Sequence, residues 1–421
     1  MLSVKAKPHG HRASVLDCGS PLPPLNWICQ SQSGRGLPQS KTPRRPSHAR
    51  RTPNIKTAVV ACLSLLLLLP WRSSAVADTA ATPSRLPQTN LLVFHNRAGR
   101  VTPVKSKADW QRRRAEIVRG MEEIMGPLPG RDKRCALDLR VEQETDGGSY
   151  VRRLITYAAE PGSRVPAHLL IPKAALGAKK RLPAILALHP TDMQYGHRVV
   201  AEQLRANYRA YGRDLVERGY VVLAPAYPIM ANYQPDLAAL GYQSGTMKAI
   251  WDNIRGLDLL ETLPYVRKGR FGAIGHSLGG HNAIYTAVFD PRLQVVVSSC
   301  GFDSFLDYYN GDPANWQPER GWCQTRYMPR LANYRGRLAE IPFDFHELLG
   351  SLAPRPVFVN APLRDANFRW QSVDNILKAG SAVYRLYGVP QNLQVEHPDC
   401  EHDFPPEARE AAYRFILDHL R

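Results

Sequence analysis

The stretch FGAIGHSLGGHNA, residues 271–283, decides the fold of this chain. Gly275 and Gly279 flank Ser277 at a spacing of two, in the pattern G-x-S-x-G. Small residues on both sides of a serine allow a sharp strand-to-helix turn that exposes the hydroxyl. Because ordinary glycine-rich turns also produce this pattern by chance, its meaning depends on the segments around it.

Short apolar runs alternate with helical stretches from Pro183 onward. The runs are PAILALHP (183–190), YVVLAPAYP (220–228), GRFGAIGHS (269–277), LQVVVSSCG (293–301), RPVFVNAP (355–362) and LQVEHP (393–398). Helical patterns fill residues 199–219 and 245–266. Continuous apolar runs are typical of strands buried on both faces, and strand–helix alternation predicts a parallel sheet with helices on both faces. Ser277 then lies at the carboxyl end of a central strand and at the start of a helix.

The segment before Pro183 has a different pattern. Apolar residues recur at helical spacing in residues 106–130 and GPLPG ends the run, which predicts a helix. Residues 136–145, 150–160 and 165–173 alternate apolar and polar side chains, as antiparallel strands with one solvated face do. The predicted fold class is therefore α/β, with an N-terminal helix and antiparallel strands preceding a mostly parallel central sheet.

A serine hydroxyl needs a base that takes its proton and a third group that orients this base. Asp365 follows the apolar strand of residues 355–362, and His402 precedes the last helix. The order serine, acid, histidine is the order that a G-x-S-x-G elbow on this architecture uses. Ser277, Asp365 and His402 are therefore the candidate nucleophile, orienting acid and general base.

Other residues compete for two of these roles. Asp374 and Asp344 are rivals for the acid, and we favour Asp365 because of its place just after a strand. His397 lies beside Pro398 at a strand end, which favours a packing role. His419 lies within the last helix, which directs it away from the site.

The motifs GHSLGG, PLRD, EHDFP and LALHP resemble the elbow, acid turn, histidine loop and oxyanion-loop start of α/β-hydrolases. The resemblance is to the acetylxylan esterase and dienelactone hydrolase type, a group related to prolyl oligopeptidase catalytic domains. It extends from about Trp110 to the C-terminus. It implies an α/β-hydrolase fold and a serine hydrolase that cleaves carboxylic esters through an acyl-enzyme on Ser277.

An oxyanion hole requires two donors directed at the developing alkoxide. The backbone N–H of Leu278, directly after the nucleophile, is one candidate. The second would come from the loop after LALHP, where Pro190 has no N–H, so we assign it to Thr191, with Asp192 as the alternative. His189 is expected to hold this loop through its ring nitrogens.

Cofactor and metal chemistry have little support in the sequence. His397, Asp399, Cys400, Glu401, His402 and Asp403 form a cluster of metal-ligand types. The chain has neither a CxxC nor an HExxH pair, so we predict no metal site and no cofactor. Pairing among Cys135, Cys300, Cys323 and Cys400 cannot be read from the sequence, although a clasp between Cys300 and Cys323 is one candidate.

The N-terminal region has the composition of a leader. We expect residues 1–55 to be a disordered basic segment, with a true translation start downstream of Met1, and residues 56–77 to be a signal peptide cleaved after Ala77. The apolar run of about 13 residues is shorter than the ~20 that a spanning helix needs. The expected protein is secreted or periplasmic, without stable membrane insertion. Residues 78–134 would be an N-terminal extension and 135–421 the hydrolase domain, with an insert at about 301–354.

The formal net charge of +18 falls when this leader is set aside. Residues 1–77 hold 11 of the 55 Lys and Arg and one of the 37 acidic residues, which leaves 44 against 36. No basic cluster interleaved with aromatic residues is present, so nucleic-acid binding is not expected.

An exported enzyme meets extracellular polymers, which favours a carbohydrate ester as the substrate. The insert is rich in aromatic residues and arginine, including Arg320, Arg326 and Arg330, although most of the aromatic residues are expected to pack its own core. We predict an acetyl ester of a polysaccharide, because the elbow reads HSLGG where glucuronoyl esterases have CSRxG. The alternatives are a glucuronoyl esterase, a dienelactone-type hydrolase and a serine peptidase of the prolyl oligopeptidase type.

Overall fold

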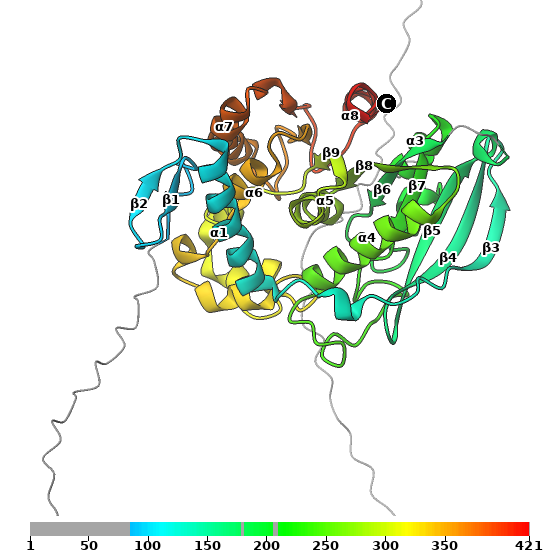
Figure 1. Cartoon of the computed structure of the whole chain (residues 1–421), viewed down its shortest axis with the longest axis horizontal. Helices are drawn as coiled ribbons and strands as arrows, with labels where there is room; N and C mark the ends of the chain where they lie inside the picture. Colours follow the sequence, from blue (N-terminus) through cyan, green and yellow to red (C-terminus); the bar gives the residue numbers. More distant parts are fainter. Residues whose placement is uncertain (1–84, 178–180, 205–208, 421) are drawn as a thin grey trace, which may run out of the picture. The chain divides into compact units, whose positions relative to one another are not determined.

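A nine-stranded mixed sheet organises the computed structural model of the protein, which describes residues 85–177, 181–204 and 209–420 (Figure 1). The strand order is β11-β10-β9-β8-β6-β7-β5-β4-β3. The strands are β3 (Arg140–Asp146), β4 (Tyr150–Glu160), β5 (Ser163–Pro172), β6 (Leu182–Leu188), β7 (Val221–Pro225), β8 (Val266–His276), β9 (Leu293–Ser299), β10 (Val357–Asn360) and β11 (Leu393–Glu396). The predicted leader (1–55), signal peptide (56–77) and cleavage after Ala77 lie outside the described residues.

Strand direction changes where β5 meets β7. From β7 through β6, β8, β9 and β10 to β11, adjacent strands pair parallel, whereas β3, β4 and β5 pair antiparallel and β5 runs antiparallel to β7. This is the α/β fold class that the alternation of segments predicts. The central strands are buried along most of their length, whereas β11 at the sheet edge is half exposed.

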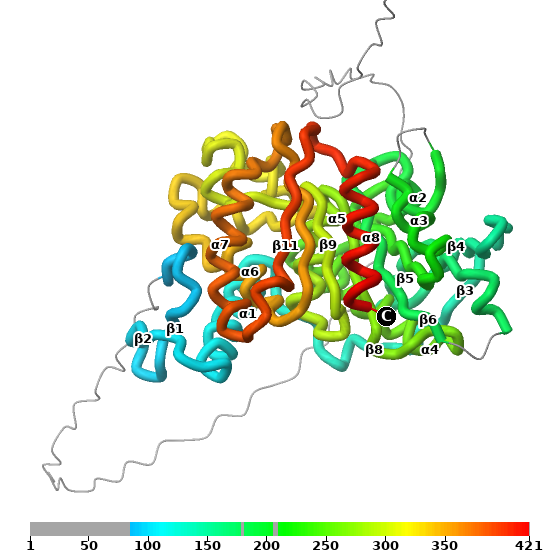
Figure 2. Tube along the Cα trace, turned by 90° about the horizontal axis from the view of Figure 1, so that it is seen from above, coloured from blue at the N-terminus to red at the C-terminus, as the bar shows by residue number. Residues whose placement is uncertain are grey.

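Helices cover both faces of the sheet. On one face lie α4 (Gly245–Thr262), α5 (Leu278–Phe289), α6 (Phe345–Leu352) and α7 (Trp370–Tyr387), and α1 (Lys107–Met125) packs against α6 and α7. On the other face lie α2 (Arg198–Ala201), α3 (Tyr211–Glu217) and α8 (Pro406–Leu420) (Figure 2). A short hairpin of β1 (Val93–His95) and β2 (Val101–Pro103) contacts α1.

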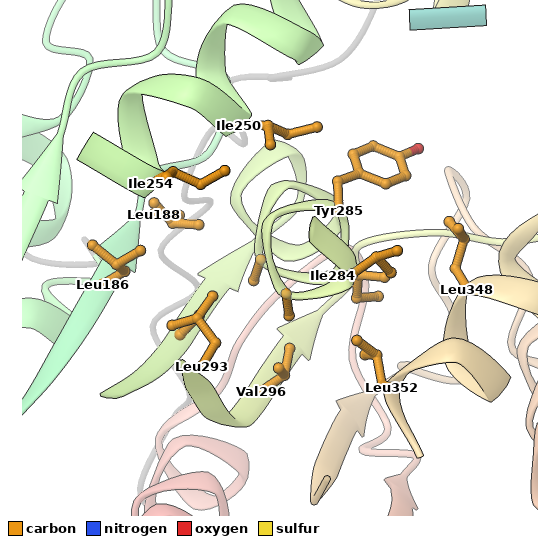
Figure 3. Packing of buried hydrophobic residues seen from close by; sticks show 14 of the residues in the cluster. Leu186, Leu188, Ile250, Ile254, Ile284, Tyr285, Leu293, Val296, Leu348 and Leu352 are labelled. Carbon is orange, nitrogen blue, oxygen red and sulfur yellow. The ribbon is translucent and has the colours of Figure 1, made fainter. Parts of the chain in front are cut away.

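The larger core lies between the sheet and helices α4, α5 and α6 (Figure 3). Leu186 and Leu188 of β6 and Val296 of β9 contribute side chains from the sheet, and Ile250 and Ile284 contribute from the helices. Because α5 begins directly after Ser277, this packing fixes the position of the serine relative to the ends of the central strands.

The helical pattern of residues 199–219 is interrupted in the structure. Helix α2 ends at Ala201, and the next described helix, α3, begins at Tyr211. Glu202 has an extended backbone and directs its carboxylate to Nε2 of His168, 3.1 Å away. A single long helix was therefore the wrong prediction here, because a contact with β5 takes Glu202 out of the helix.

Residues 301–344, between β9 and α6, form a series of short 3₁₀ turns. These are η3 (Tyr308–Gly311), η4 (Pro313–Trp316), η5 (Gly321–Cys323), η6 (Pro329–Tyr334) and η7 (Leu338–Glu340). Phe302, Phe305, Trp316 and Trp322 are buried, and Phe305 contacts the rings of Trp316 and Trp322. The expectation that these aromatic residues pack a core of the segment's own is wrong, because they join the larger core described above and Phe302 and Phe305 pack on Phe345 of α6. Among the described helices, none is long and apolar enough to cross a membrane.

Candidate active site

Ser277 occupies a strained turn between β8 and α5. Its φ of 54° and ψ of −120° lie where residues with a side chain are uncommon. A Cβ on Gly275 would lie 2.1 Å from the backbone of Gly279, and one on Gly279 would lie 1.9 Å from the carbonyl oxygen of Leu188. Both glycines are therefore required by close backbone approach, and the turn has the geometry that a nucleophile elbow requires.

The structure brings Ser277, His402 and Asp365 together. Nε2 of His402 lies 3.0 Å from Oγ of Ser277, and Nδ1 lies 2.8 Å from Oδ2 of Asp365. The two contacts leave the imidazole between a hydroxyl and a carboxylate. This arrangement allows the ring to take the serine proton while the carboxylate stabilises the resulting imidazolium.

Asp365 is held by its own turn. Its second oxygen, Oδ1, accepts hydrogen bonds from the backbone N–H groups of Asn367 (2.8 Å) and Phe368 (3.1 Å). The carboxylate side chain is only 1 % exposed, and the ring of Phe368 packs 5.9 Å from that of His402. Both carboxylate oxygens are thus engaged, which fixes the direction in which Asp365 faces His402.

The rival residues have other partners. Nε2 of His397 contacts Asp374 at 3.0 Å, and its Nδ1 contacts the carbonyl oxygen of Ala361 at 2.7 Å. Asp344 caps α6, and His419 contacts the carbonyl of Phe415 within α8. None of these contacts reaches Ser277.

A buried polar network that the sequence analysis missed supports the histidine loop. Nδ2 of Asn360 donates to the carbonyl oxygen of Asp403 (2.9 Å) and to Oγ of Ser299 (2.8 Å). Ser299 also contacts Nδ1 of His276, whose ring lies 5.0 Å from that of His402. The available signal was the polar end of two apolar strands, Ser298 and Ser299 in β9 and Asn360 in β10.

The loop after β6 is held against the segment that follows β7 through His189. Nε2 of His189 accepts the N–H of Tyr227 at 3.0 Å, and Nδ1 contacts the carbonyl of Pro190 at 2.8 Å. Burial lowers the pKa of His189 to about 4, so the ring is neutral near pH 7. This is the loop-holding contact that the sequence predicts for this residue.

The two oxyanion candidates lie on different elements. Leu278 is the first residue of α5, where backbone N–H groups have no partner within the helix. Thr191 is exposed on the loop after His189, and its Oγ1 lies 3.0 Å from the hydroxyl of Tyr327. The N–H of Asp192 contacts Sδ of Met230 at 3.4 Å, which leaves Thr191 as the better placed of the two loop donors.

The position of Cys300 contradicts the candidate disulfide with Cys323 and bears on the predicted absence of a metal site. It is not joined to Cys323, and all four described cysteines are free thiols. Its Sγ instead lies 3.2 Å from the carbonyl oxygen of Asp403, because its side chain faces the histidine loop, whereas Cys323 is buried within the 3₁₀ segment.

The Cys300 thiol also forms, with Asp365 and His402, a group of metal-ligand types within 4.8 Å of one another. Burial and the nearby Asp365 raise the pKa of Cys300 well above its usual value, which disfavours the thiolate that a metal requires. Both nitrogens of His402 are already engaged with Ser277 and Asp365. These contacts fit proton transfer through His402 and Asp365 better than metal binding by the three side chains.

Comparison with known proteins supports an esterase of this fold. Residues 237–388 match the family model of glucuronyl esterases of fungi. A 4-O-methyl-glucuronoyl methylesterase of Wolfiporia cocos is 25 % identical over 391 residues, covering 84 % of this chain and 88 % of that protein. The Bacillus subtilis protein YtaP, named only as a hydrolase, is 26 % identical over 318 residues, covering 73 % of this chain and all of that protein.

Solved structures give the same fold. A glucuronoyl esterase from Solibacter usitatus superposes with a TM-score of 0.62 and 20 % identity, covering 80 % of this chain and 99 % of that one. The chain therefore has the α/β-hydrolase fold that its motifs resemble.

Proposed function

We propose that this α/β-hydrolase, a carboxylic ester hydrolase, cleaves an ester carried by a carbohydrate through a covalent acyl-enzyme on Ser277. His402 removes the Ser277 proton as the hydroxyl attacks the ester carbonyl, and it returns this proton to the leaving alcohol. Asp365 orients the ring and stabilises the imidazolium. A water molecule, activated by the same histidine, then hydrolyses the acyl-enzyme.

The single observation that carries this proposal is the continuous contact from Ser277 through His402 to Asp365, at 3.0 and 2.8 Å. The strained backbone of Ser277 adds support, because such strain is retained where a side chain must be presented in one direction. We assign the oxyanion hole to the backbone N–H groups of Leu278 and Thr191.

Two acyl groups have specific support. The relatives named for a substrate favour a glucuronoyl ester. Leu278, which follows the nucleophile in a small-residue elbow, favours an acetyl ester, because an arginine follows the serine in the CSRxG form of glucuronoyl esterases. We retain the acetyl ester of a polysaccharide as the first candidate and the glucuronoyl ester as the second.

We also propose that the enzyme acts after export, secreted or in the periplasm, with residues 1–77 removed. The basic region, apolar run and small-residue tripeptide of the N-terminus support this. N-terminal sequencing of the exported protein should give a first residue at Asp78. A mature protein that begins within residues 1–55 would contradict the cleavage.

The nucleophile can be tested by labelling. A fluorophosphonate probe should modify Ser277, and Ser277→Ala should lose both labelling and hydrolysis of p-nitrophenyl acetate by several orders of magnitude. Ser381→Ala, which removes an exposed hydroxyl on α7, is the matched control and should behave as the wild type. Labelling of another residue with Ser277 unmodified would refute the assignment.

The substrate class can be tested with three compounds: acetylated xylan, a methyl ester of glucuronic acid, and a dipeptide amide. Release from either sugar ester, with the amide untouched, is the expected result. Hydrolysis of the amide alone would replace the esterase with a peptidase.

A further inference from the structure

Residues Gln324–Tyr327 form a segment that is fixed to the first turn of α4. The N–H of Gly245 donates to the carbonyl of Thr325 (2.9 Å), and the N–H of Thr246 donates to that of Tyr327 (3.2 Å). Between them, the hydroxyl of Tyr227 donates to the carbonyl of Arg326 (2.8 Å). Three consecutive carbonyls are thus held, so the directions of the Arg326 and Tyr327 side chains are determined by the backbone.

Gly245 shows how closely this segment approaches α4. A Cβ built on Gly245 would lie 2.3 Å from the carbonyl oxygen of Arg326, a distance that no side chain tolerates. The helix therefore begins with glycine after the Ser244 cap because the segment lies directly against it. A contact this close shows that the segment packs tightly against α4 and is not a loosely packed surface loop.

Arg326 and Tyr327 both contact the loop that carries the oxyanion candidate. The hydroxyl of Tyr327 lies 3.0 Å from Oγ1 of Thr191, and Nη1 of Arg326 lies 3.0 Å from Sδ of Met193. Tyr327 also packs against the small cluster that contains Leu278, the residue after the nucleophile. The two side chains therefore border the reaction site on the side of Thr191.

The guanidinium of Arg326 is held in place, but no carboxylate among the described residues neutralises its charge. Within the described part of the chain it forms no ion pair, and its Nε is buried without a hydrogen-bond partner. Its other contacts are the Gln324 amide and Met193, a residue that is 55 % exposed and whose thioether is a weak acceptor. The ring of Tyr327, 5.5 Å from the guanidinium carbon, supports one face of the group.

Other arginines of the same region are used differently. Arg330 donates to the carbonyl of Glu123 on α1, and Arg369 pairs with Asp307. Those contacts join elements of the fold and leave the guanidinium occupied. Arg326 alone of these three combines a fixed backbone, a buried unpartnered donor and a place beside the oxyanion loop.

We propose that Arg326 is a specificity-determining residue that binds a free carboxylate of the substrate, on the sugar that carries the ester. A planar guanidinium matches a carboxylate through two parallel hydrogen bonds, and this pairing is stronger than one to a neutral hydroxyl. The carboxylate displaces Met193 from Nη1, while Tyr327 holds the guanidinium from the other side. The proposal rests on the first candidate of the proposed function, an acetyl ester, because the carboxyl group of a glucuronoyl ester is itself esterified, and it narrows the substrate to an acetyl ester on an acidic sugar.

The charge of the chain agrees with an anionic polymer. Residues 78–421 carry 44 basic and 36 acidic residues, an excess that attracts polyanions at long range. Long-range attraction raises the association rate for any acidic polymer, whereas Arg326 would select the position of one carboxylate relative to the ester.

The test compares two substrates that differ in one group, acetylated methyl glucoside and acetylated methyl glucosiduronate, with p-nitrophenyl acetate as a third. The wild type should prefer the glucosiduronate by about tenfold or more in kcat/KM, as expected for a charge-assisted pair. Arg326→Gln should abolish this preference and leave hydrolysis of p-nitrophenyl acetate within about threefold. Arg326→Lys, which keeps the charge but not the planar fork, should retain part of the preference.

Arg335→Gln is the matched control, since Arg335 is exposed in the same region and should keep the wild-type preference. Equal kcat/KM of the wild type for the two sugars would overturn the inference. An equal loss on all three substrates in Arg326→Gln would also overturn it, because it would indicate a role at the oxyanion or in folding. Failure of the wild type to hydrolyse any ester, p-nitrophenyl acetate included, would instead refute the proposed function itself.

Discussion

Two histidines on the loop between β11 and α8 each contact a carboxylate. His402 contacts Asp365 at 2.8 Å, and His397, five residues earlier, contacts Asp374 at 3.0 Å. The difference lies at the other ring nitrogen, which faces the hydroxyl of Ser277 in His402 and the backbone carbonyl of Ala361 in His397. A carbonyl oxygen has no proton to give, so the second pair can hold the loop but cannot activate a nucleophile.

The two carboxylates also differ in burial. The side chain of Asp365 is 1 % exposed and that of Asp374 is 44 % exposed. An exposed pair is screened by water and contributes little to stability, whereas a buried one holds a single geometry. The comparison shows that a histidine–carboxylate contact indicates catalysis only when burial and the third group agree.

Substituting each of the two histidines should give the largest difference in kcat between the two pairs. His402→Asn should reduce kcat by about 10⁵-fold or more, because the members of such a triad act as a unit. His397→Asn should keep kcat within about tenfold, since it removes only a loop contact. Steady-state hydrolysis of p-nitrophenyl acetate measures both, and similar losses in the two variants would refute the distinction.

Substituting each of the two carboxylates should give the second largest difference in kcat. Asp365→Asn should reduce kcat by about 10⁴-fold, because an amide no longer selects the tautomer that presents Nε2 to the serine. Asp374→Asn should change kcat by less than about threefold. Both substitutions conserve shape, so thermal unfolding should verify that each variant is folded. A large loss in Asp374→Asn would place that acid in the mechanism.

The network beneath His402 should show a smaller effect. Asn360→Ala removes the donor to the carbonyl of Asp403 and should lower kcat by about tenfold with KM little changed, because His402 is then less well placed. Asn392→Ala removes an amide that likewise donates to a backbone carbonyl, that of Pro354, and should leave kcat unchanged. An effect of Asn360→Ala on KM alone would argue against a positioning role.

His189 extends the comparison to a histidine whose two nitrogens both contact the backbone. Its pKa of about 4 in the folded chain lies below the ordinary 6.5, so the unfolded chain binds the proton first as the pH falls. The stabilisation present above pH 6.5 is therefore lost towards pH 4, by about 3 kcal/mol in total. The difference in unfolding free energy between wild type and His189→Asn should fall accordingly.

Urea unfolding at pH 7.5 and pH 4 measures this difference. The difference between the wild type and Asn392→Ala serves as the control and should not change in this way. A difference for His189→Asn that is independent of pH would show that the ring is not kept neutral by burial.

The strands and the elbow could be predicted because their signals are local. Apolar runs such as 183–190 and 293–301 indicate burial on both faces, and the glycines at 275 and 279 indicate close backbone approach. Each of these signals depends on residues within a few positions of one another. The broken helix at residues 199–219 shows the limit, since Glu202, where it is interrupted, contacts His168 of β5, 34 positions away.

The sequence by itself determined the fold class, the order of the elements and the three candidate residues of the triad, because periodicity and glycine spacing record which residues are buried and where the backbone turns. Only the tertiary structure decided which histidine meets which carboxylate, that Cys300 faces Asp403 and not Cys323, and that Arg326 contacts Met193 and forms no ion pair among the described residues. Ser277 and His402 are 125 positions apart, and a hydrogen bond between them depends on the packing of several intervening elements. A contact over such a separation leaves no pattern in either local sequence, so it is fixed only when the helices and the sheet come together.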